Sequence, residues 1–161
     1  MSAALGAPKD ILPSEIRGLL VPLKTDHLLL PNAMVAEVVN YQAPEQIHDA
    51  PAWLKGCVAW RGEIVPLISV ERLAGLAENA LGQRARIVVC TTLGEGSRLT
   101  YFGLMAQAIP RLVRITSASL QPVEADNQDF GILTRLTIDG EPAVILDVDG
   151  LEGELTRILQ G

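Results

Sequence analysis

The most reactive side chains in this sequence are two cysteines and two histidines: Cys57, Cys90, His27 and His48. A thiol activated by an imidazole is an effective nucleophile, so one hypothesis is a small thiol enzyme or ligand-binding β-barrel that uses Cys57 or Cys90 with His48. Both cysteines, however, lie in apolar runs typical of strands, and both histidines fall in segments with turn or loop composition. This pattern favours buried, reduced thiols, and we expect no catalytic residues.

The carboxylates in "LDVDG", Asp147 and Asp149, are spaced like the first ligands of a calcium loop. An EF-hand needs further oxygen ligands at fixed positions, and this stretch supplies only the first pair. The sequence also lacks a CxxC pair, an HExxH motif, a Walker A loop and a GxSxG motif. We therefore expect no metal, no cofactor and no enzymatic activity.

The Arg61-Gly62 pair, which Trp60 precedes, suggests binding rather than catalysis. Arginine and tryptophan are enriched at the hot spots of protein interfaces, and an arginine at a hairpin tip presents its guanidinium to a partner. The alternative is that Arg61 is a solvated turn residue and that Trp53 and Trp60 fill the core. The residues alone leave both interpretations open.

The elements that would position these residues are mainly strands. Most apolar segments are short, rich in Val, Ile and Leu, and bounded by Gly, Pro, Asn or Asp, which is typical of strands and turns. We predict hairpins and single strands in the following ranges: 17–23 with 27–30, 33–41, 57–60 with 63–68, 85–92, 99–109, 111–115, and 132–138 with 143–146.

The remaining segments read as loops and short helices. We predict a helical turn at 69–75 closed by Gly75, and an amphipathic helix at the C-terminus, where Leu151, Leu155, Ile158 and Leu159 recur at helical spacing. Residues 42–56 read as a loop with one helical turn between Asp49 and Gly56, and 116–129 as surface turns. Pro66 cannot donate to a ladder and predicts a strand edge or bulge.

An internal repeat relates the two halves of the chain. "GEIVPLISVERLAG" at 62–75 aligns without gaps on "GEPAVILDVDGLEG" at 140–153, an offset of 78 residues (140 − 62). Ser69 and Asp147 occupy equivalent positions, and each can cap the helical turn that follows. The repeat predicts two similar β subdomains, one in each half. Arg61 and Trp60 are not repeated, because Asp139 and Ile138 stand in their places.

Composition limits the classes of partner and location. The formal charge is −6 and the 13 Lys and Arg residues are scattered, which argues against nucleic-acid binding. No run approaches the roughly 18–20 apolar residues that a membrane-spanning helix needs, and the N-terminus lacks signal-peptide features. We expect a cytoplasmic protein with a flexible segment at 1–15 and no membrane insertion.

"WLKGCVAWRGEIVPLISVERLAG" closely resembles the signature of the CheW-like family, adaptors that couple chemoreceptors to a histidine kinase. The positions that carry the resemblance are Gly56, Arg61, Gly62, Ile64, Val65, Pro66, Leu67, Ile68, Leu73 and Gly75. The likeness extends from about Glu15 to Leu159, through the "VAEVV" strand, "ARIVVCTT" with "YFGLMAQAI", and "GEPAVILDVDGL".

The resemblance implies a fold and two partners. It implies a single CheW-like domain at 16–161 that is mainly β, with two SH3-like five-stranded barrels, a boundary near 76–84, and an open question of strand exchange between the barrels. It implies a non-catalytic adaptor that binds the regulatory domain of a CheA-type histidine kinase and, in an apolar groove between the barrels, the tip of a methyl-accepting chemoreceptor. The partner-binding residues it implies are Arg61, Gly56, Gly62, Trp60, Val35 and Glu37.

The sequence also departs from the family pattern. Ala59-Trp60 stands where many members have Asn-Leu, Ser69 where Asp is common, and Gln107-Ala108 where Asp-Gly is frequent. These differences suggest a divergent adaptor, one that serves pilus-driven surface motility rather than flagella.

Overall fold

The computed structural model describes residues 16–76, 78, 81–92, 99–123 and 130–160, apart from the side chain of residue 160. The segment 1–15, predicted to be flexible, lies outside these residues. The strands are β1 (Ile16–Pro22), β2 (His27–Pro31), β3 (Val35–Asn40), β4 (Leu54–Trp60), β5 (Glu63–Ile68), β6 (Arg86–Thr91), β7 (Tyr101–Ala106), β8 (Arg111–Ile115), β9 (Leu120–Pro122), β10 (Ile132–Ile138) and β11 (Glu141–Leu146). The helices are the 3₁₀ turn η1 (Asn32–Met34), α2 (Val70–Leu73) and α3 (Val148–Gln160).

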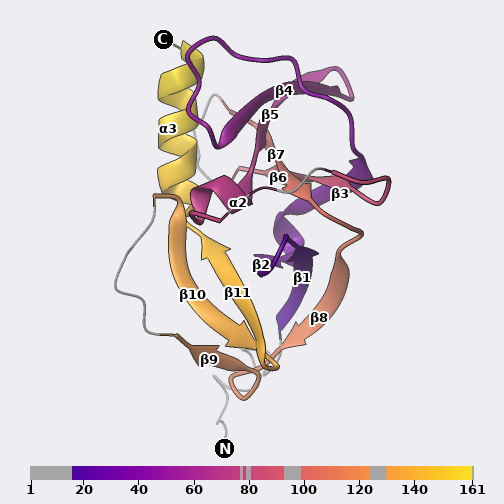
Figure 1. Ribbon diagram of the computed structural model, residues 1–161, viewed down its shortest axis with the longest axis vertical. Coiled ribbons are helices and arrows are strands. Elements are labelled where there is room, and N and C mark those ends of the chain that lie inside the picture. The colour runs from indigo at the N-terminus through magenta and orange to yellow at the C-terminus, as the bar shows by residue number, and fades with distance from the viewer. Residues whose placement is uncertain (1–15, 77, 79–80, 93–98, 124–129, 161) are drawn as a thin grey trace, which may run out of the picture.

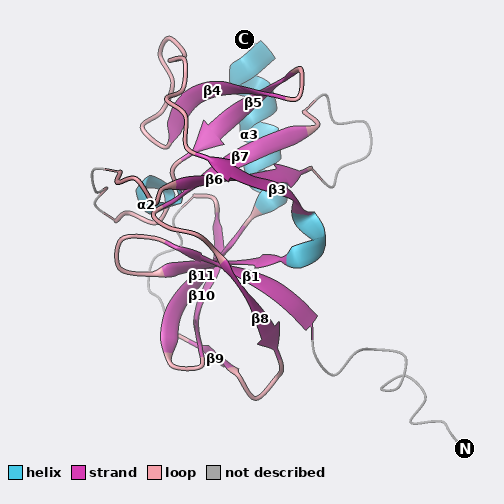
Figure 2. Cartoon of the chain, turned by 90° about the vertical axis from the view of Figure 1, so that its right-hand side faces the viewer, coloured by secondary structure: helices cyan, strands magenta, loops and turns pink. Residues whose placement is uncertain are grey.

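The strands form two sheets that stack one above the other (Figure 1, Figure 2). One sheet has five strands in the order β3-β6-β7-β5-β4, and the other has six in the order β8-β1-β2-β11-β10-β9. The C-terminal helix α3 runs beside the five-stranded sheet (Figure 2). The mainly β fold with a C-terminal helix is therefore confirmed, although one sheet has six strands rather than five.

The repeat seen in the sequence is also a repeat of structure. The hairpin β4–β5 has a register shift between Leu54 and Gly56, and the hairpin β10–β11 has one between Ile132 and Thr134, 78 residues later. The helix that follows each hairpin is capped as predicted: Ser69 Oγ accepts the Arg72 N–H at 3.3 Å, and Asp147 Oδ1 accepts the Gly150 N–H at 3.1 Å.

The two sheets do not divide the chain into halves. The order β3-β6-β7-β5-β4 corresponds to β8-β1-β2-β11-β10, and β5 pairs in parallel with β7 as β11 does with β2. The strands β1 and β2 thus complete the second copy from the N-terminal end of the chain. The sheets therefore do not follow the two halves of the sequence. A subdomain boundary near 76–84 and an exchange of strands between two barrels stay predictions.

Three apolar clusters stabilise this arrangement. The largest contains residues of both sheets together with α2 and α3, including Leu28, Ile68, Leu104 and Leu155, all fully buried. One smaller cluster lies within each sheet; Val65 and Ile87 belong to the five-stranded sheet, and further core residues belong to the six-stranded one. Because the large cluster joins the sheets, burial of apolar surface holds them together.

Several local predictions need correction. Gly56 does not end a helical turn; it lies inside β4 with φ of 137°, beside the register shift. Pro66 lies in an inner strand rather than at an edge, but the register shift between Leu54 and Gly56 lies beside it, as the bulge alternative predicted. Its β4 partner Cys57 directs its own N–H and C=O toward Glu45, and the pairing with β7 begins at Leu67, so neither neighbouring strand needs an N–H from Pro66. Part of the stretch predicted as turns forms the short strand β9. Within the described ranges, no helix is long and apolar enough to cross a membrane.

Candidate partner-binding site

The hairpin β4–β5 places Arg61 and Gly62 at its tip. Trp60 pairs with Glu63, and the two residues between them have positive φ angles of 48° and 77°, as a two-residue type I′ turn requires. Nothing lies within 4 Å of the point where a Gly62 side chain would begin, so Gly62 is needed for its backbone angle alone. The turn presents the Arg61 side chain, which is 69% exposed.

Glu37 on β3 accepts hydrogen bonds from two residues of the hairpin and so joins them in one cluster. Its Oε1 accepts a hydrogen bond from Trp60 Nε1 at 2.9 Å and another from Arg61 Nε at 3.1 Å. The guanidinium carbon of Arg61 lies 5.4 Å from the centre of the Trp60 ring, within cation–π range. Trp60 also meets Tyr101 edge to face, with ring centres 4.8 Å apart. Four of the six sequence-predicted residues therefore contact one another directly or share the turn.

The two donors also tune the charge of Glu37. The hydrogen bond from Trp60, followed by the one from Arg61, holds the pKa of the Glu37 carboxyl below its ordinary value. Both hydrogen bonds favour the ionised form. The site is therefore a surface ion pair in which the guanidinium lies beside both the carboxylate and the indole ring.

The same cluster closes a seam in the five-stranded sheet. β3 and β4 are the outer strands of that sheet, and the hydrogen bonds from Trp60 and Arg61 to Glu37 join them. In the second copy, Ile138 and Asp139 stand at the positions of Trp60 and Arg61, and the strand registers place Arg111 of β8 at the position of Glu37. Arg111 Nη2 donates to Glu141 Oε2 at 2.6 Å, so the second copy also has an ion pair here, but between different residues.

The other two predicted residues lie elsewhere. Val35 is at the start of β3, pairs with Cys90 and packs against the cluster shared by both sheets. Gly56 lies on β4, where a Cβ would be 2.2 Å from the carbonyl oxygen of Glu45. Glu45 exchanges two backbone hydrogen bonds with Cys57, each of 2.8 Å, so the chain passes too close to Gly56 to leave room for a side chain.

The thiol-enzyme hypothesis is not supported. Burial raises the pKa of Cys90 to about 12, and burial together with the nearby Glu45 carboxylate raises the pKa of Cys57. A nucleophilic cysteine needs a lowered pKa, whereas the pKa of each of these thiols is raised, so neither thiol is activated. His48 is exposed and pairs with its neighbour Asp49. No group of three or more His, Cys, Asp or Glu side chains in the described ranges is placed to hold a metal ion.

Sequence reasoning missed an exposed apolar strip near β8. Ile109 is 56% exposed and Leu112 is 60% exposed, and β8 forms one edge of the six-stranded sheet. Exposed apolar side chains on an unpaired strand edge offer a surface on which a partner can dock. The sequence of 111–115 indicates this exposure, because Val113 and Ile115 lie on the same face of the strand and Leu112 lies on the opposite face.

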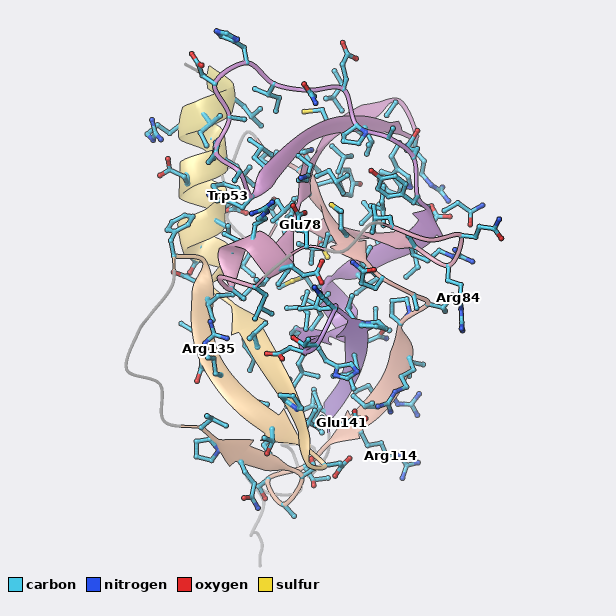
Figure 3. All side chains as sticks on the ribbon, in the orientation of Figure 1. Trp53, Glu78, Arg84, Arg114, Arg135 and Glu141 are labelled. Carbon is cyan, nitrogen blue, oxygen red and sulfur yellow. The ribbon has the colours of Figure 1, made fainter. Side chains whose placement is uncertain are left out.

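A separate hollow of about 1040 Å³ lies between the β3–β4 loop and α3. Trp53, labelled in Figure 3, forms part of its floor and packs against Phe130 with ring centres 5.7 Å apart. The rim carries the contact between His48 and Asp49 and the ion pair between Glu154 and Arg157.

Two stacked, related β sheets, each with a hairpin followed by a capped helix, define a duplicated, mainly β fold. The family model for the CheW-like domain matches residues 17–154, and the chain belongs to the CheW-like family. The crystal structure of scaffolding protein TtCheW from Thermoanaerobacter tengcongensis is similar, with a TM-score of 0.69, 20% identity, and coverage of 85% of this chain and 87% of that chain. The comparison with curated proteins found no match. The function that this family membership supports is that of a chemotaxis adaptor, associated with chemoreceptors and CheA.

Proposed function

We propose that this protein is a non-catalytic cytoplasmic adaptor that binds a chemoreceptor tip and the regulatory domain of a CheA-type kinase through two separate surfaces. The receptor surface comprises Glu37, Trp60, Arg61 and Gly62, with Val35 further along β3. The kinase surface comprises Ile109 and Leu112 at the edge of the six-stranded sheet. The observation that carries the proposal is the Glu37–Trp60–Arg61 cluster, which places an exposed guanidinium beside an indole ring at a hairpin tip, where the second copy has Asp139 and Ile138.

The chemistry of the cluster supports a helical, acidic partner. The hydrogen bond from Arg61 to Glu37 uses only Nε, so the Nη donors of the guanidinium remain available to a partner. These donors can take a carboxylate from a partner, while Trp60 offers apolar area beside them. The family resemblance suggests the helical tip of a receptor as this partner. Family members bind that tip near the strand whose positions correspond to Val35 and Glu37.

The second surface rests on its exposure and its place in the fold. Leu112 lies on the edge strand β8, which pairs with β1 on one side and with no strand of the described sheet on the other. A partner can therefore approach Leu112 without displacing a strand. Family members dock barrel to barrel with the kinase regulatory domain, and an exposed apolar edge strip suits such docking. We therefore assign this strip to the kinase.

The test is isothermal titration calorimetry of the full chain with a cognate receptor tip and a cognate kinase regulatory domain. The expected result is micromolar or tighter binding to each. Arg61→Glu should weaken receptor binding by at least about tenfold, as loss of a hot-spot arginine does. It should change the free energy of unfolding by less than about 1 kcal/mol, because the Arg61–Glu37 pair is exposed.

Arg157→Glu is the matched control. Arg157 is 71% exposed and is likewise paired with a glutamate, Glu154, but it lies on α3 away from both surfaces. This variant should bind both partners as the unaltered chain does. Absence of binding to every cognate tip and kinase domain would refute the adaptor function, and unfolding of Arg61→Glu would show that the arginine is structural.

A further inference from the structure

A buried carboxylate lies where the two sheets meet. Glu71 belongs to the four-residue helix α2 and is only 4% exposed. Its Oε2 accepts a hydrogen bond from the backbone N–H of Lys24, and its Oε1 accepts one from Gln107 Nε2 at 3.1 Å. Burial of an ionised carboxylate is costly unless donors compensate it, and both of these donors are neutral groups.

One donor belongs to the six-stranded sheet and the other to the connection between the two sheets. Lys24 lies in the turn between β1 and β2 of the six-stranded sheet, whereas α2 follows β5 of the five-stranded sheet. Gln107 lies in the connection from β7 to β8, where the chain crosses between the sheets. The backbone N–H of Gln107 also bonds to the carbonyl of Pro22 at 2.9 Å, so this connection and the β1–β2 turn are joined to each other as well as to Glu71.

The opposite end of α2 has a second tie to the six-stranded sheet. Arg135 on β10 points up toward α2 (Figure 3), and its Nη2 donates to the carbonyl of Ala74 at 2.9 Å. A guanidinium at the C-terminal end of a helix satisfies one of its free carbonyls. The short helix is thus bonded to the six-stranded sheet at both ends, at the level where Figure 1 shows the sheets in contact.

The residue type at 107 matches the carboxylate at 71. Many members of the family that this chain resembles have Asp at this position, whereas this chain has Gln107. An aspartate there could not donate to Glu71, and two carboxylates at a buried site would repel each other. The Gln107 amide donates a hydrogen bond to Glu71, whereas an aspartate would repel it. This contact explains why the chain departs from the family pattern at position 107.

We infer that Glu71 is a positioning residue that locks the relative orientation of the two sheets through Lys24 and Gln107. The large apolar cluster holds the sheets together but is not directional, whereas hydrogen bonds to one carboxylate specify direction and distance. If the chain is the adaptor proposed above, on which this consequence rests, the lock sets the angle between the Arg61 and Leu112 surfaces.

The test is a swap that conserves side-chain volume. Gln107→Glu faces Glu71 with a second carboxylate, Glu71→Gln leaves two amides that can still pair, and the double variant Glu71→Gln/Gln107→Glu restores one amide and one carboxylate. Spin labels at exposed positions in each sheet, Glu63→Cys and Thr134→Cys in a Cys57→Ser/Cys90→Ala background, report the distance between the sheets by double electron–electron resonance.

The expected result is a shifted or broadened distance distribution in Gln107→Glu, little change in Glu71→Gln, and recovery in the double variant. Should Gln107→Glu fail to fold, Gln107→Ala, which only removes the amide, should broaden the distribution. A distribution unchanged in every folded single variant would overturn the inference, even if stability falls, because a merely stabilising contact does not alter orientation. No partner is present in this measurement, so its outcome is independent of the adaptor function.

Discussion

Glu37 has two roles that compete for the same atom. Its Oε1 accepts hydrogen bonds from both Trp60 and Arg61, so it closes the seam between β3 and β4 and also orients the guanidinium. A partner carboxylate that pairs with Arg61 leaves the Trp60 contact intact, because the indole donates only one hydrogen bond. Binding at Arg61 therefore need not open the seam.

The lowered pKa of Glu37 predicts how the site responds to acid. The pKa of Glu37 in the folded protein lies below its ordinary value. The ionised carboxylate and its hydrogen bonds to Trp60 and Arg61 are therefore fully present above the ordinary pKa, and they are lost as pH falls through the folded-state pKa. In a Trp53→Phe variant, Trp60 is the remaining tryptophan, and its emission should change in this acidic window while far-ultraviolet circular dichroism stays constant. Adding Glu37→Gln should abolish the transition; its persistence would show that another group is titrating.

At the scale of residues, the sequence predicted the members of the site better than their contacts. Arg61, Gly62 and Trp60 are adjacent in the chain, so their grouping was available from the turn alone. Glu37 lies 23 residues from Trp60 on a strand that does not pair with β4, and no local pattern predicts contact across such a seam. Gly56 has a packing role that only the approach of Glu45 shows; its part in partner binding stays a prediction.

At the scale of elements, the unit repeated is a bulged hairpin, a two-residue turn and a capped helix. Both turns have positive φ at their two central residues: Arg61 and Gly62 in one, Asp139 and Gly140 in the other. The positive φ at Arg61 is unfavourable for a residue that is neither Gly, Asn nor Asp. The second copy uses the ordinary Asp-Gly pair, so the unfavourable φ angle of the first copy occurs at Arg61, the residue proposed to bind a partner.

The paired caps give a test of the repeat. Ser69→Ala and Asp147→Ala should each lower the free energy of unfolding by about 1 kcal/mol, because each removes the acceptor for an N–H in the first turn of a helix. Urea denaturation of both variants measures this change. Ser69→Thr and Asp147→Asn keep an acceptor oxygen and should remain near the unaltered value. Equal stability of the alanine and control variants would contradict the capping role.

The sequence predicted the elements better than their grouping into sheets. Hairpins and capped helices are local, and a 14-residue match was enough to reveal them. Which strands complete each sheet depends on long-range pairs such as Val144 with Leu28, which leave no periodic signal because both partners are simply apolar. Likewise, β9 pairs through only three residues of a polar stretch, too few for an alternating pattern.

At the scale of the whole molecule, the duplication explains why one chain can join two partners. Each sheet derives from the same unit, yet the polar contacts at the corresponding place differ: Trp60 and Arg61 donate to Glu37 in the first copy, whereas Arg111 donates to Glu141 in the second. The exposed apolar strip at Ile109 and Leu112 belongs to the second copy. Two surfaces of different chemistry on related halves suit an adaptor that must bind two unlike proteins at once.

The final prediction tests whether these surfaces act independently. Leu112→Glu should weaken binding to the kinase regulatory domain by at least about tenfold, because it places a charge in a contact that binding would desolvate. Receptor binding should persist, and the double variant Arg61→Glu/Leu112→Glu should lose both partners. Leu133→Glu is the control, since Leu133 is also 60% exposed and lies on β10 of the same sheet.

Calorimetry with each partner, then with both, distinguishes the outcomes. Equal weakening by Leu133→Glu would mean that any added charge on this sheet disturbs kinase binding, which contradicts a specific Leu112 surface. Loss of receptor binding in Leu112→Glu would mean that the two surfaces are one. If each single variant loses one partner and keeps the other, the chain binds them at separate surfaces, and the orientation set by Glu71 becomes the quantity that determines how the two partners are aligned.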